Sequence, residues 1–297
     1  MYPPVDVLLQ RLKGVAKGLF LMRDYDPIVL RKKIPAPHHT DPNNQAYLPD
    51  IKMQIDAELC IRSLSAEYNC DTLVLGEETG EYPESLAGET RSVAVVDAVD
   101  GTDLMVRGLS NYCLSFAFFD PAQQKIHLSV VAHSSGILYY ATDAGAFQEN
   151  AAGVTRKLQV NTNGVRLKDS SICFYGQKPR FLMGVLRRRH FIGRIREFER
   201  RMESGEKLDV RLYNLAGNPM MAKIPDGAVD LVFEVSGQEV HDIIPGAFIA
   251  VKAGARLVGL DGQPIDLAKS LLSPRKKLTY ILASSQALID EMLPLLK

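Results

Sequence analysis

The sequence predicts a mixed fold in which an N-terminal α+β half is joined to a C-terminal α/β half. Short apolar segments typical of strands gather between residues 72 and 140, whereas strand and helix patterns alternate after about residue 153. A chain of 297 residues is long enough for one large domain or for two smaller ones. We therefore expect residues 1–152 to form the first half and residues 153–297 to form the second.

The N-terminal half is expected to begin with two helices and to continue as a sheet. Residues 5–24 carry apolar side chains at alternating steps of three and four, which is typical of an amphipathic helix. Residues 50–67 return to a helical spacing, and the apolar positions are Ile51, Ile55, Leu59 and Leu64. The polar segment between the helices, residues 33–47, is long enough to suggest a functional loop. Strands are predicted at residues 72–76, 92–96, 113–119, 127–132 and 137–140.

The C-terminal half alternates strands with helices. Strands are predicted at residues 171–175, 229–235, 256–259 and 279–283. Helices are predicted at residues 181–202, 219–224 and 243–253, the last ended by Gly254. The first of these helices is basic, and such a run is commonly a solvated helix face.

Composition and charge exclude several classes of protein. Apolar residues make up 46% of the chain and charged residues 24%, as in ordinary globular proteins. The 35 basic and 35 acidic side chains balance, which argues against a nucleic-acid partner because such binding needs a basic surface. The four cysteines lack a Cys-x-x-Cys spacing, which favours reduced thiols in a cytoplasmic protein. No segment is long and apolar enough to span a bilayer, and the N-terminus lacks a signal-peptide pattern, so no membrane association is expected.

Acidic side chains follow two of the predicted strands and begin one of the predicted helices. Glu77 and Glu78 come after one strand, Asp97 and Asp100 come after the next, and Asp242 begins a later helix. Strand ends and helix starts are the places where side chains from separate segments converge. Asp242 alone is also explained as a helix cap, so the argument depends on the two aspartates that lie three residues apart.

The Asp97–Asp100 pair predicts a divalent cation site. Gly101 permits a tight turn that brings Asp100 back beside Asp97, and two carboxylates held so close repel each other unless a cation neutralises them. Carboxylate oxygens suit Mg²⁺, which takes further ligands from phosphate, and two ions about 3.5–4 Å apart are a known device for phosphate hydrolysis. The alternative is an acidic surface turn, which Glu77 and Glu78 disfavour.

Three motifs together resemble the inositol monophosphatase family: "GEE" at 76–78, "DAVDGTD" at 97–103 and "HDIIPGAFIAVKAGARLVGLDGQPID" at 241–266. Their order and spacing match over about residues 50–266. This family belongs to a lithium-sensitive, Mg²⁺-dependent phosphatase superfamily that includes fructose-1,6-bisphosphatase and the bisphosphate nucleotidases. The resemblance implies a layered αβαβα sandwich, two or three Mg²⁺ ions and a homodimer.

The resemblance also implies a role for each residue of the motifs. The metal ligands would be Glu77, Asp97, Asp100, Asp242 and the backbone carbonyl of Val99. Glu78 matches the second acidic residue of the family's Gly-Glu-Glu motif. Thr102, together with Glu77, would activate the attacking water, and the amides of Gly101 and Thr102 would receive the phosphate.

The chain departs from the family pattern at several flanking positions. Ala98 stands where the family has proline, His241 where it has tryptophan, and Ile244-Pro245 where it has two alanines. These changes alter packing around the motifs, but they remove no metal ligand.

The upstream aspartate of the family is the least clear match. Counting back from Glu77 places Gln54 where that aspartate would fall, and Asp50 and Asp56 lie close by on the same predicted helix. Of the two, we expect Asp56 to pair with Thr102. Without either aspartate, slow or absent turnover would follow.

The expected function is hydrolysis of a small phosphorylated metabolite by a metal-activated water. Glu234 is the nearest match to an acidic residue that contacts substrate hydroxyls in inositol-type members, which favours inositol monophosphate or a related polyol or sugar phosphate. Arginines of residues 187–201 could instead bind a second phosphate, as in a sugar bisphosphate or 3′-phosphoadenosine 5′-phosphate.

Two further alternatives stand beside this function. A haloacid-dehalogenase-type phosphatase is disfavoured because the two aspartates of its nucleophile motif lie two residues apart, not three as here. A catalytically impaired family member that acts as a binding or regulatory protein is the other alternative. The survival of every recognisable metal carboxylate argues against it.

Overall fold

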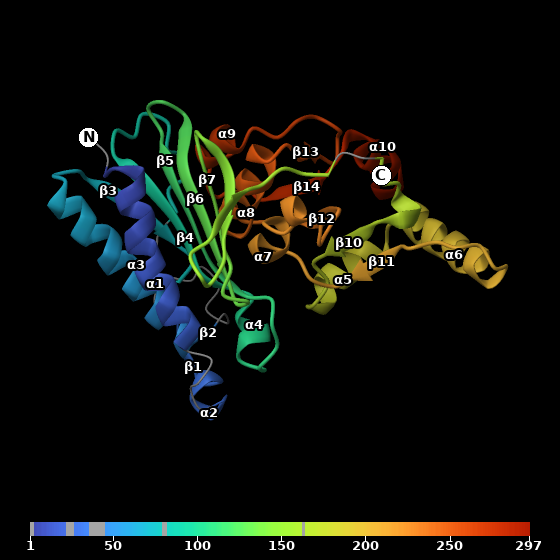
Figure 1. Ribbon diagram of the computed structural model, residues 1–297, viewed down its shortest axis with the longest axis horizontal. Coiled ribbons are helices and arrows are strands. Elements are labelled where there is room, and N and C mark those ends of the chain that lie inside the picture. Colours follow the sequence, from blue (N-terminus) through green and yellow to red (C-terminus); the bar gives the residue numbers. More distant parts are fainter. Residues whose placement is uncertain (1–2, 22–26, 36–44, 79–81, 162–163) are drawn as a thin grey trace.

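The computed structural model describes residues 3–21, 27–35, 45–78, 82–161 and 164–297, and their elements form five layers (Figure 1). Helices cover the outer face of a seven-stranded sheet, other helices lie between this sheet and a five-stranded sheet, and further helices cover the outer face of the second sheet. The predicted αβαβα layering is confirmed.

The first layer consists of α1 (Val5–Leu21) and α3 (Leu48–Glu67), which pack against each other and against the seven-stranded sheet. The buried positions of α3 include Met53, Ala57, Ile61 and Leu64. Ile55 and Leu59, two of the predicted apolar positions, are instead 46% and 60% exposed. The predicted helix was therefore correct in extent but was wrong about which face carries the core.

The loop predicted between the two helices contains ordered pieces. It follows the short helix α2 (Pro27–Leu30) and begins and ends with β1 (Lys33–Pro35) and β2 (Gln45–Tyr47), which pair antiparallel. The middle of the predicted loop lies outside the described residues, as does the expected end of the first helix.

The seven-stranded sheet follows the chain in order from β3 to β9. Its strands are β3 (Thr72–Gly76), β4 (Ser92–Asp100), β5 (Cys113–Asp120), β6 (Lys125–His133), β7 (Leu138–Thr142), β8 (Gly145–Glu149) and β9 (Thr155–Lys157). The pair β3–β4 is parallel and the other pairs are antiparallel. The last two strands, which the sequence did not predict, are short and have few apolar residues. Since β9 lies beyond residue 152, it extends this sheet past the predicted division of the chain, and the division itself stays a prediction.

A bulge in β4 places two aspartates on the same face of the sheet. Residues three apart on a regular strand point to opposite faces. Here Asp97 lies opposite Ser115 and Asp100 lies opposite Cys113, so three residue steps on β4 match two steps on β5. The extra residue of such a bulge re-aims the side chains that follow it. The strand therefore extends to Asp100, beyond its expected end at residue 96, and the bulge brings the carboxylates together.

The middle layer and the second sheet come from the C-terminal half. The middle layer contains α7 (Asn218–Met221), α8 (Val240–Lys252) and α9 (Leu267–Leu271), and α8 packs against β4 to β8 of the first sheet. The five-stranded sheet has the order β11 (Arg211–Tyr213), β10 (Ser171–Phe174), β12 (Leu231–Gln238), β14 (Leu278–Ala283) and β13 (Arg256–Gly259). Its first three strands are parallel, and β14 runs antiparallel to both of its neighbours.

The outer layer differs from the prediction in one respect. The predicted basic helix over residues 181–202 is two helices, α5 (Pro179–Leu186) and α6 (Arg189–Glu203). The break falls at Arg188, whose ψ of 84° is far from the helical value. The last helix, α10 (Gln286–Leu296), packs on β13, β14 and α6. Within the part of the chain that the structure describes, no helix combines the length and apolar character needed to cross a membrane.

Candidate metal and phosphate site

Four carboxylates from three elements share one electrostatic environment between the first sheet and α8. Glu77 follows β3, Asp97 and Asp100 come from the bulged end of β4, and Asp242 lies in the first turn of α8. Glu77, Asp100 and Asp242 each act through their charge on Asp97, whose side chain is almost completely buried. The structure thus places together the four carboxylates that the sequence motifs single out as metal ligands.

Burial and mutual repulsion make these groups hard to ionise without a cation. Burial is the larger cause and repulsion from neighbouring carboxylates adds to it, so the pKa of Asp97 and the pKa of Asp100 both lie well above their usual range. Burial also raises the pKa of Glu77, against the nearby His241, which lowers it. A buried acidic cluster of this kind is stable in its charged form when a cation neutralises it.

Oxygen atoms without hydrogen-bond partners show that the cluster has free capacity for a cation. Asp97 Oδ1 accepts a hydrogen bond from the Val99 amide at 3.1 Å, but Asp97 Oδ2 and Glu78 Oε2 are buried without a partner. Buried polar atoms are normally paired, so such atoms call for an explanation. Among the described residues, no three His, Cys, Asp or Glu side chains already stand close enough to hold an ion. The donor set fits Mg²⁺, which would draw the carboxylates closer.

We expect the stability of the metal-free protein to fall as pH rises. Burial raises the pKa of Asp50 from 3.8, and that of Glu78 from 4.5, to about 8. A group whose pKa is raised in the folded state stabilises the fold below its unfolded pKa, and this contribution is lost as pH rises through the folded pKa. The melting temperature without metal should therefore decrease between about pH 4 and pH 8. Mg²⁺ should raise the melting temperature more at pH 8 than at pH 5. An equal rise in melting temperature at both pH values would contradict this account.

Thr102 pairs with Asp50, and the prediction that it pairs with Asp56 is wrong. The Thr102 hydroxyl lies 2.6 Å from Asp50 Oδ1 and 2.7 Å from the Val99 carbonyl oxygen. A hydroxyl donates one hydrogen bond at a time. When the Thr102 hydroxyl donates to ionised Asp50, the Val99 carbonyl oxygen stays free to face an ion. Asp56 instead accepts a hydrogen bond from Lys52 at 2.6 Å on the solvent side of α3.

The backbone after the aspartates forms a tight turn into the one-turn helix α4 (Thr102–Met105). Gly101 has a φ of +93°, and a Cβ at this position would lie 2.8 Å from the Asn111 carbonyl oxygen. Only glycine fits both the left-handed conformation and this close approach. The amides of Gly101 and Thr102 therefore follow the carboxylate pair directly, and their predicted contact with phosphate stays a prediction.

Asn218, which the sequence did not single out, ties the site to the helices of the middle layer. Its backbone amide donates to Asp100 Oδ2 at 2.7 Å, while its side-chain amide donates to Ser115 Oγ and to the His241 carbonyl. Its side-chain oxygen accepts from the Gly246 amide at 2.8 Å. Asn218 thereby fixes Asp100 relative to the start of α8. The sequence offers no motif that could have identified it.

An Asn218→Ala substitution is expected to destabilise the fold. Asn218 is fully buried, and its removal leaves the Ser115 hydroxyl, the His241 carbonyl and the Gly246 amide without this partner. An unsatisfied buried polar group costs about 1–3 kcal/mol, and we expect a loss of at least this size in the free energy of unfolding measured with denaturant. The matched control is Asn150→Ala, at an exposed turn where water can replace the lost bonds. Equal losses for the two variants would contradict the role of Asn218.

The two predicted substrate-selecting features lie in different surroundings. Glu234 is buried in β12, and its carboxylate accepts hydrogen bonds from the backbone of the residues that follow it, including the Ser236 amide. The Glu234 carboxylate therefore has its hydrogen-bond partners within its own strand. The arginines of residues 187–201 lie on the outer helix α6 and at its junction with α5, and several form ion pairs along α6. The substrate contacts predicted for either feature stay predictions.

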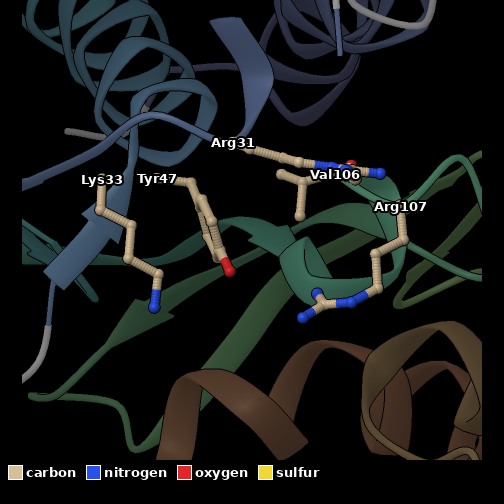
Figure 2. A pocket seen from close by; sticks show the side chains of 5 residues that line it. All are labelled: Arg31, Lys33, Tyr47, Val106 and Arg107. Carbon is tan, nitrogen blue, oxygen red and sulfur yellow. The ribbon is translucent and has the colours of Figure 1, made fainter. Parts of the chain in front are cut away.

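A cationic pocket of about 240 Å³ lies beside α4 (Figure 2). It is lined by Arg31, Lys33, Tyr47, Val106 and Arg107. Figure 2 shows the Lys33 amine, the Tyr47 hydroxyl and the Arg107 guanidinium on the same side of the pocket. The Tyr47 hydroxyl donates to Asp103 Oδ1 at 3.2 Å, which joins this pocket to the residue directly after Thr102. Arg107 also forms an ion pair with Asp103 at 2.9 Å, so Arg31 and Lys33 supply most of the positive charge that favours an anionic ligand here.

The fold of this chain is similar to the folds of several solved structures. The chain resembles the solved IMPase of Thermotoga maritima, with 18% identity, coverage of 98% of this chain and 95% of that one, and a TM-score of 0.69. It also resembles the extragenic suppressor protein suhB of Bartonella henselae, with 18% identity, 98% coverage of both chains and a TM-score of 0.67.

A third similar structure is described as an IMPase/NADP phosphatase complexed with Mg²⁺ and phosphate, with 18% identity, coverage of 97% and 95%, and a TM-score of 0.63. A comparison with curated proteins finds no match. The model of the inositol monophosphatase family matches residues 33–289, which include all four carboxylates of the site. The chain belongs to the inositol monophosphatase family, a membership that supports a phosphatase.

Proposed function

We propose that this protein is a Mg²⁺-dependent, lithium-sensitive phosphomonoesterase that acts on a small phosphorylated metabolite such as inositol monophosphate or another polyol or sugar phosphate. The observation that carries the proposal is the bulged end of β4, where Asp97 and Asp100 share a face and Asp97 Oδ2 is buried without a partner. Glu77 and Asp242 complete an acidic set that needs a cation. We also propose that the chain works as a homodimer, which light scattering would test.

The carboxylates would hold two or three Mg²⁺ ions, with the Val99 carbonyl as a further ligand. When bound, Mg²⁺ supplies positive charge to the phosphate oxygens and lowers the pKa of water. Glu78, buried next to Glu77 and Asp50, would support the arrangement through its charge. Asn218 would hold Asp100 in place through its backbone amide.

Thr102 and Asp50 would help to remove the proton of the attacking water. The hydroxyl oxygen of Thr102 would accept a hydrogen bond from the attacking water. The hydroxyl hydrogen of Thr102 points to Asp50 Oδ1, 2.6 Å away. The amides of Gly101 and Thr102 would orient the phosphate for attack in line with the leaving oxygen. Because water attacks phosphorus directly, the residues need to supply no covalent nucleophile.

A panel of phosphorylated metabolites tests the proposal. Phosphate release should require Mg²⁺ and should be highest for one class among polyol monophosphates, sugar phosphates and nucleoside bisphosphates. A folded protein that binds Mg²⁺ but releases no phosphate from any member would contradict the proposal. The same result would favour a catalytically impaired binding or regulatory protein.

A substrate with two phosphates is a second candidate, favoured by the cationic pocket beside α4. Lys33→Ala should raise the KM for a sugar bisphosphate or 3′-phosphoadenosine 5′-phosphate roughly tenfold to hundredfold, because a charge-assisted contact contributes about 1.5–3 kcal/mol. The KM for monophosphates should change less. The control is Lys207→Ala on the exposed segment after α6. If Lys33→Ala changes both KM values equally, the pocket does not select a second phosphate.

A further inference from the structure

His241 is a buried histidine in the first turn of α8, next to Asp242, where the related motif has tryptophan. Its Nδ1 lies 2.8 Å from the Tyr82 hydroxyl oxygen, and the two rings are tilted with centroids 5.6 Å apart. One side of the imidazole is therefore fixed by a specific partner. The other ring nitrogen, Nε2, faces the acidic site.

The hydrogen bonds around Tyr82 favour one tautomer of the neutral His241 ring. The Tyr82 hydroxyl also lies 3.5 Å from the Leu75 carbonyl oxygen, to which it can only donate. When the hydroxyl donates its proton to that carbonyl, its oxygen accepts a hydrogen bond from Nδ1–H of His241. In the neutral ring, which is the form that binds a metal ion, Nε2 then carries the lone pair. A ring N–H that donates to a fixed oxygen is the arrangement that orients metal-binding histidines.

Nε2 lies near two of the site's carboxylates, at distances that a bound ion would have to shorten. His241 Nε2 lies 3.6 Å from Asp242 Oδ1 and 4.0 Å from Glu77 Oε1. Both distances are too long for a direct hydrogen bond. With metal–ligand bonds of about 2.1 Å, two donors of one octahedral ion lie about 3.0 Å apart when adjacent and about 4.2 Å apart when opposite. The 4.0 Å distance is close to the opposite arrangement, whereas the 3.6 Å distance lies between the two, so a shared ion would bring Nε2 and Asp242 closer together.

We propose that His241 is a nitrogen ligand of one ion in this site and that Tyr82 positions its ring. This inference rests on the metal site of the proposed function and adds an imidazole to a set made of oxygen donors. Carboxylates suit both Mg²⁺ and Mn²⁺, whereas an imidazole ligand favours a transition ion over Mg²⁺. The site is therefore expected to bind Mn²⁺ more tightly than Mg²⁺, and His241 is expected to supply part of this preference.

Direct Mn²⁺ binding, measured by calorimetry and by pulsed electron paramagnetic resonance, tests the inference without an activity assay. The samples are the wild type, His241→Phe, Tyr82→Phe and the matched control His190→Phe on exposed α6. Asp97→Asn establishes that the measured Mn²⁺ occupies the acidic site. Wild-type protein labelled with ¹⁵N-histidine shows whether a coupled nitrogen belongs to histidine.

The expected result is a histidine nitrogen coupling to Mn²⁺ in the wild type and in His190→Phe, and none in His241→Phe. Tyr82→Phe should keep the coupling but weaken Mn²⁺ binding about tenfold to hundredfold, the usual cost of losing the partner of a metal-binding histidine. Mg²⁺ binding should weaken less in both variants, so the preference for Mn²⁺ should shrink. If His241→Phe does not fold, the labelled wild type and Tyr82→Phe decide the question.

Bound Mn²⁺ without a histidine coupling in the wild type would overturn the inference, as would a coupling that persists in His241→Phe. These results leave the proposed phosphatase untouched. Conversely, a His241 coupling in a protein that releases no phosphate from any substrate would support the ligand and refute the phosphatase. The two claims can therefore fail separately.

Discussion

An Asp97→Asn variant is expected to lose at least about a hundredfold to a thousandfold of Mg²⁺-dependent phosphate release while remaining folded. Metal ions stabilise the transition state of phosphate hydrolysis by several kcal/mol, and each 1.36 kcal/mol changes the rate tenfold. Asp97 is buried among Glu77, Asp100 and Asp242, so its charge is central to holding the ions. Asparagine keeps the shape of the side chain but removes that charge. Asp242→Asn is expected to behave in the same way.

The stability of Asp97→Asn provides a second readout for this prediction. Because burial, and after it repulsion from neighbouring carboxylates, raises the pKa of Asp97, an uncharged side chain there should stabilise the metal-free protein at pH 8 and reduce the increase in melting temperature caused by Mg²⁺. The matched control is Asp120→Asn, a buried aspartate at the far end of β5. Near-wild-type turnover of Asp97→Asn would refute its assignment as a metal ligand.

An Asp50→Asn variant is expected to lower kcat by roughly a hundredfold to ten-thousandfold, the usual contribution of a positioned acid–base group. Asp50 Oδ1 lies 2.6 Å from the Thr102 hydroxyl. The amide of asparagine cannot accept a proton from that hydroxyl as a carboxylate can. The KM should change less than kcat, because Asp50 would act on the attacking water through the Thr102 hydroxyl.

Asp56→Asn provides a control on the same helix. Asp56 pairs with Lys52 on the outer side of α3, and its substitution should leave kcat within about twofold of the wild type, as expected for an exposed ion pair. If Asp56→Asn impairs kcat and Asp50→Asn does not, the Thr102–Asp50 pairing is not the catalytic one.

The convergence of the four carboxylates could be predicted from the sequence because each lies in a local motif at the end of an apolar strand or at the start of a helix. The layered fold was predicted from the same family resemblance, and the strand and helix alternation agrees with it. The cause of the Asp97–Asp100 pairing could not be predicted. A bulge is defined by the register against β5, which no local pattern in β4 reveals.

The identity of the upstream aspartate depended on the face of α3, and the sequence was misleading there. Ile55 and Leu59 suggested a buried stripe, but both side chains are exposed, while Gln54 is fully buried. A signal for Asp50 was nevertheless present. Pro49 and Asp50 are residues typical of a first helical turn, and Asp50 Oδ2 accepts a hydrogen bond from the Tyr47 amide at 3.0 Å. Placing the helix start at residue 48 directs Asp50 inward and Asp56 outward.

The contacts of Asn218 depend on tertiary structure alone. They join β4, β5 and α8, which are more than twenty residues away from Asn218 in the sequence. A Cβ at Gly246 would lie 2.8 Å from the backbone of Asn218, so the close packing of α7 on α8 also requires a glycine there. Such requirements become visible only when the layers are assembled.

The most direct test of the central claim is the rate of phosphate release from the best substrate as Mg²⁺ is removed and restored. We expect release by the wild type to stop when a chelator removes the divalent ions and to return when Mg²⁺ is added back, while Asp97→Asn stays inactive throughout. Release that continues unchanged in the presence of the chelator, or that Asp97→Asn retains, would contradict hydrolysis at this carboxylate site.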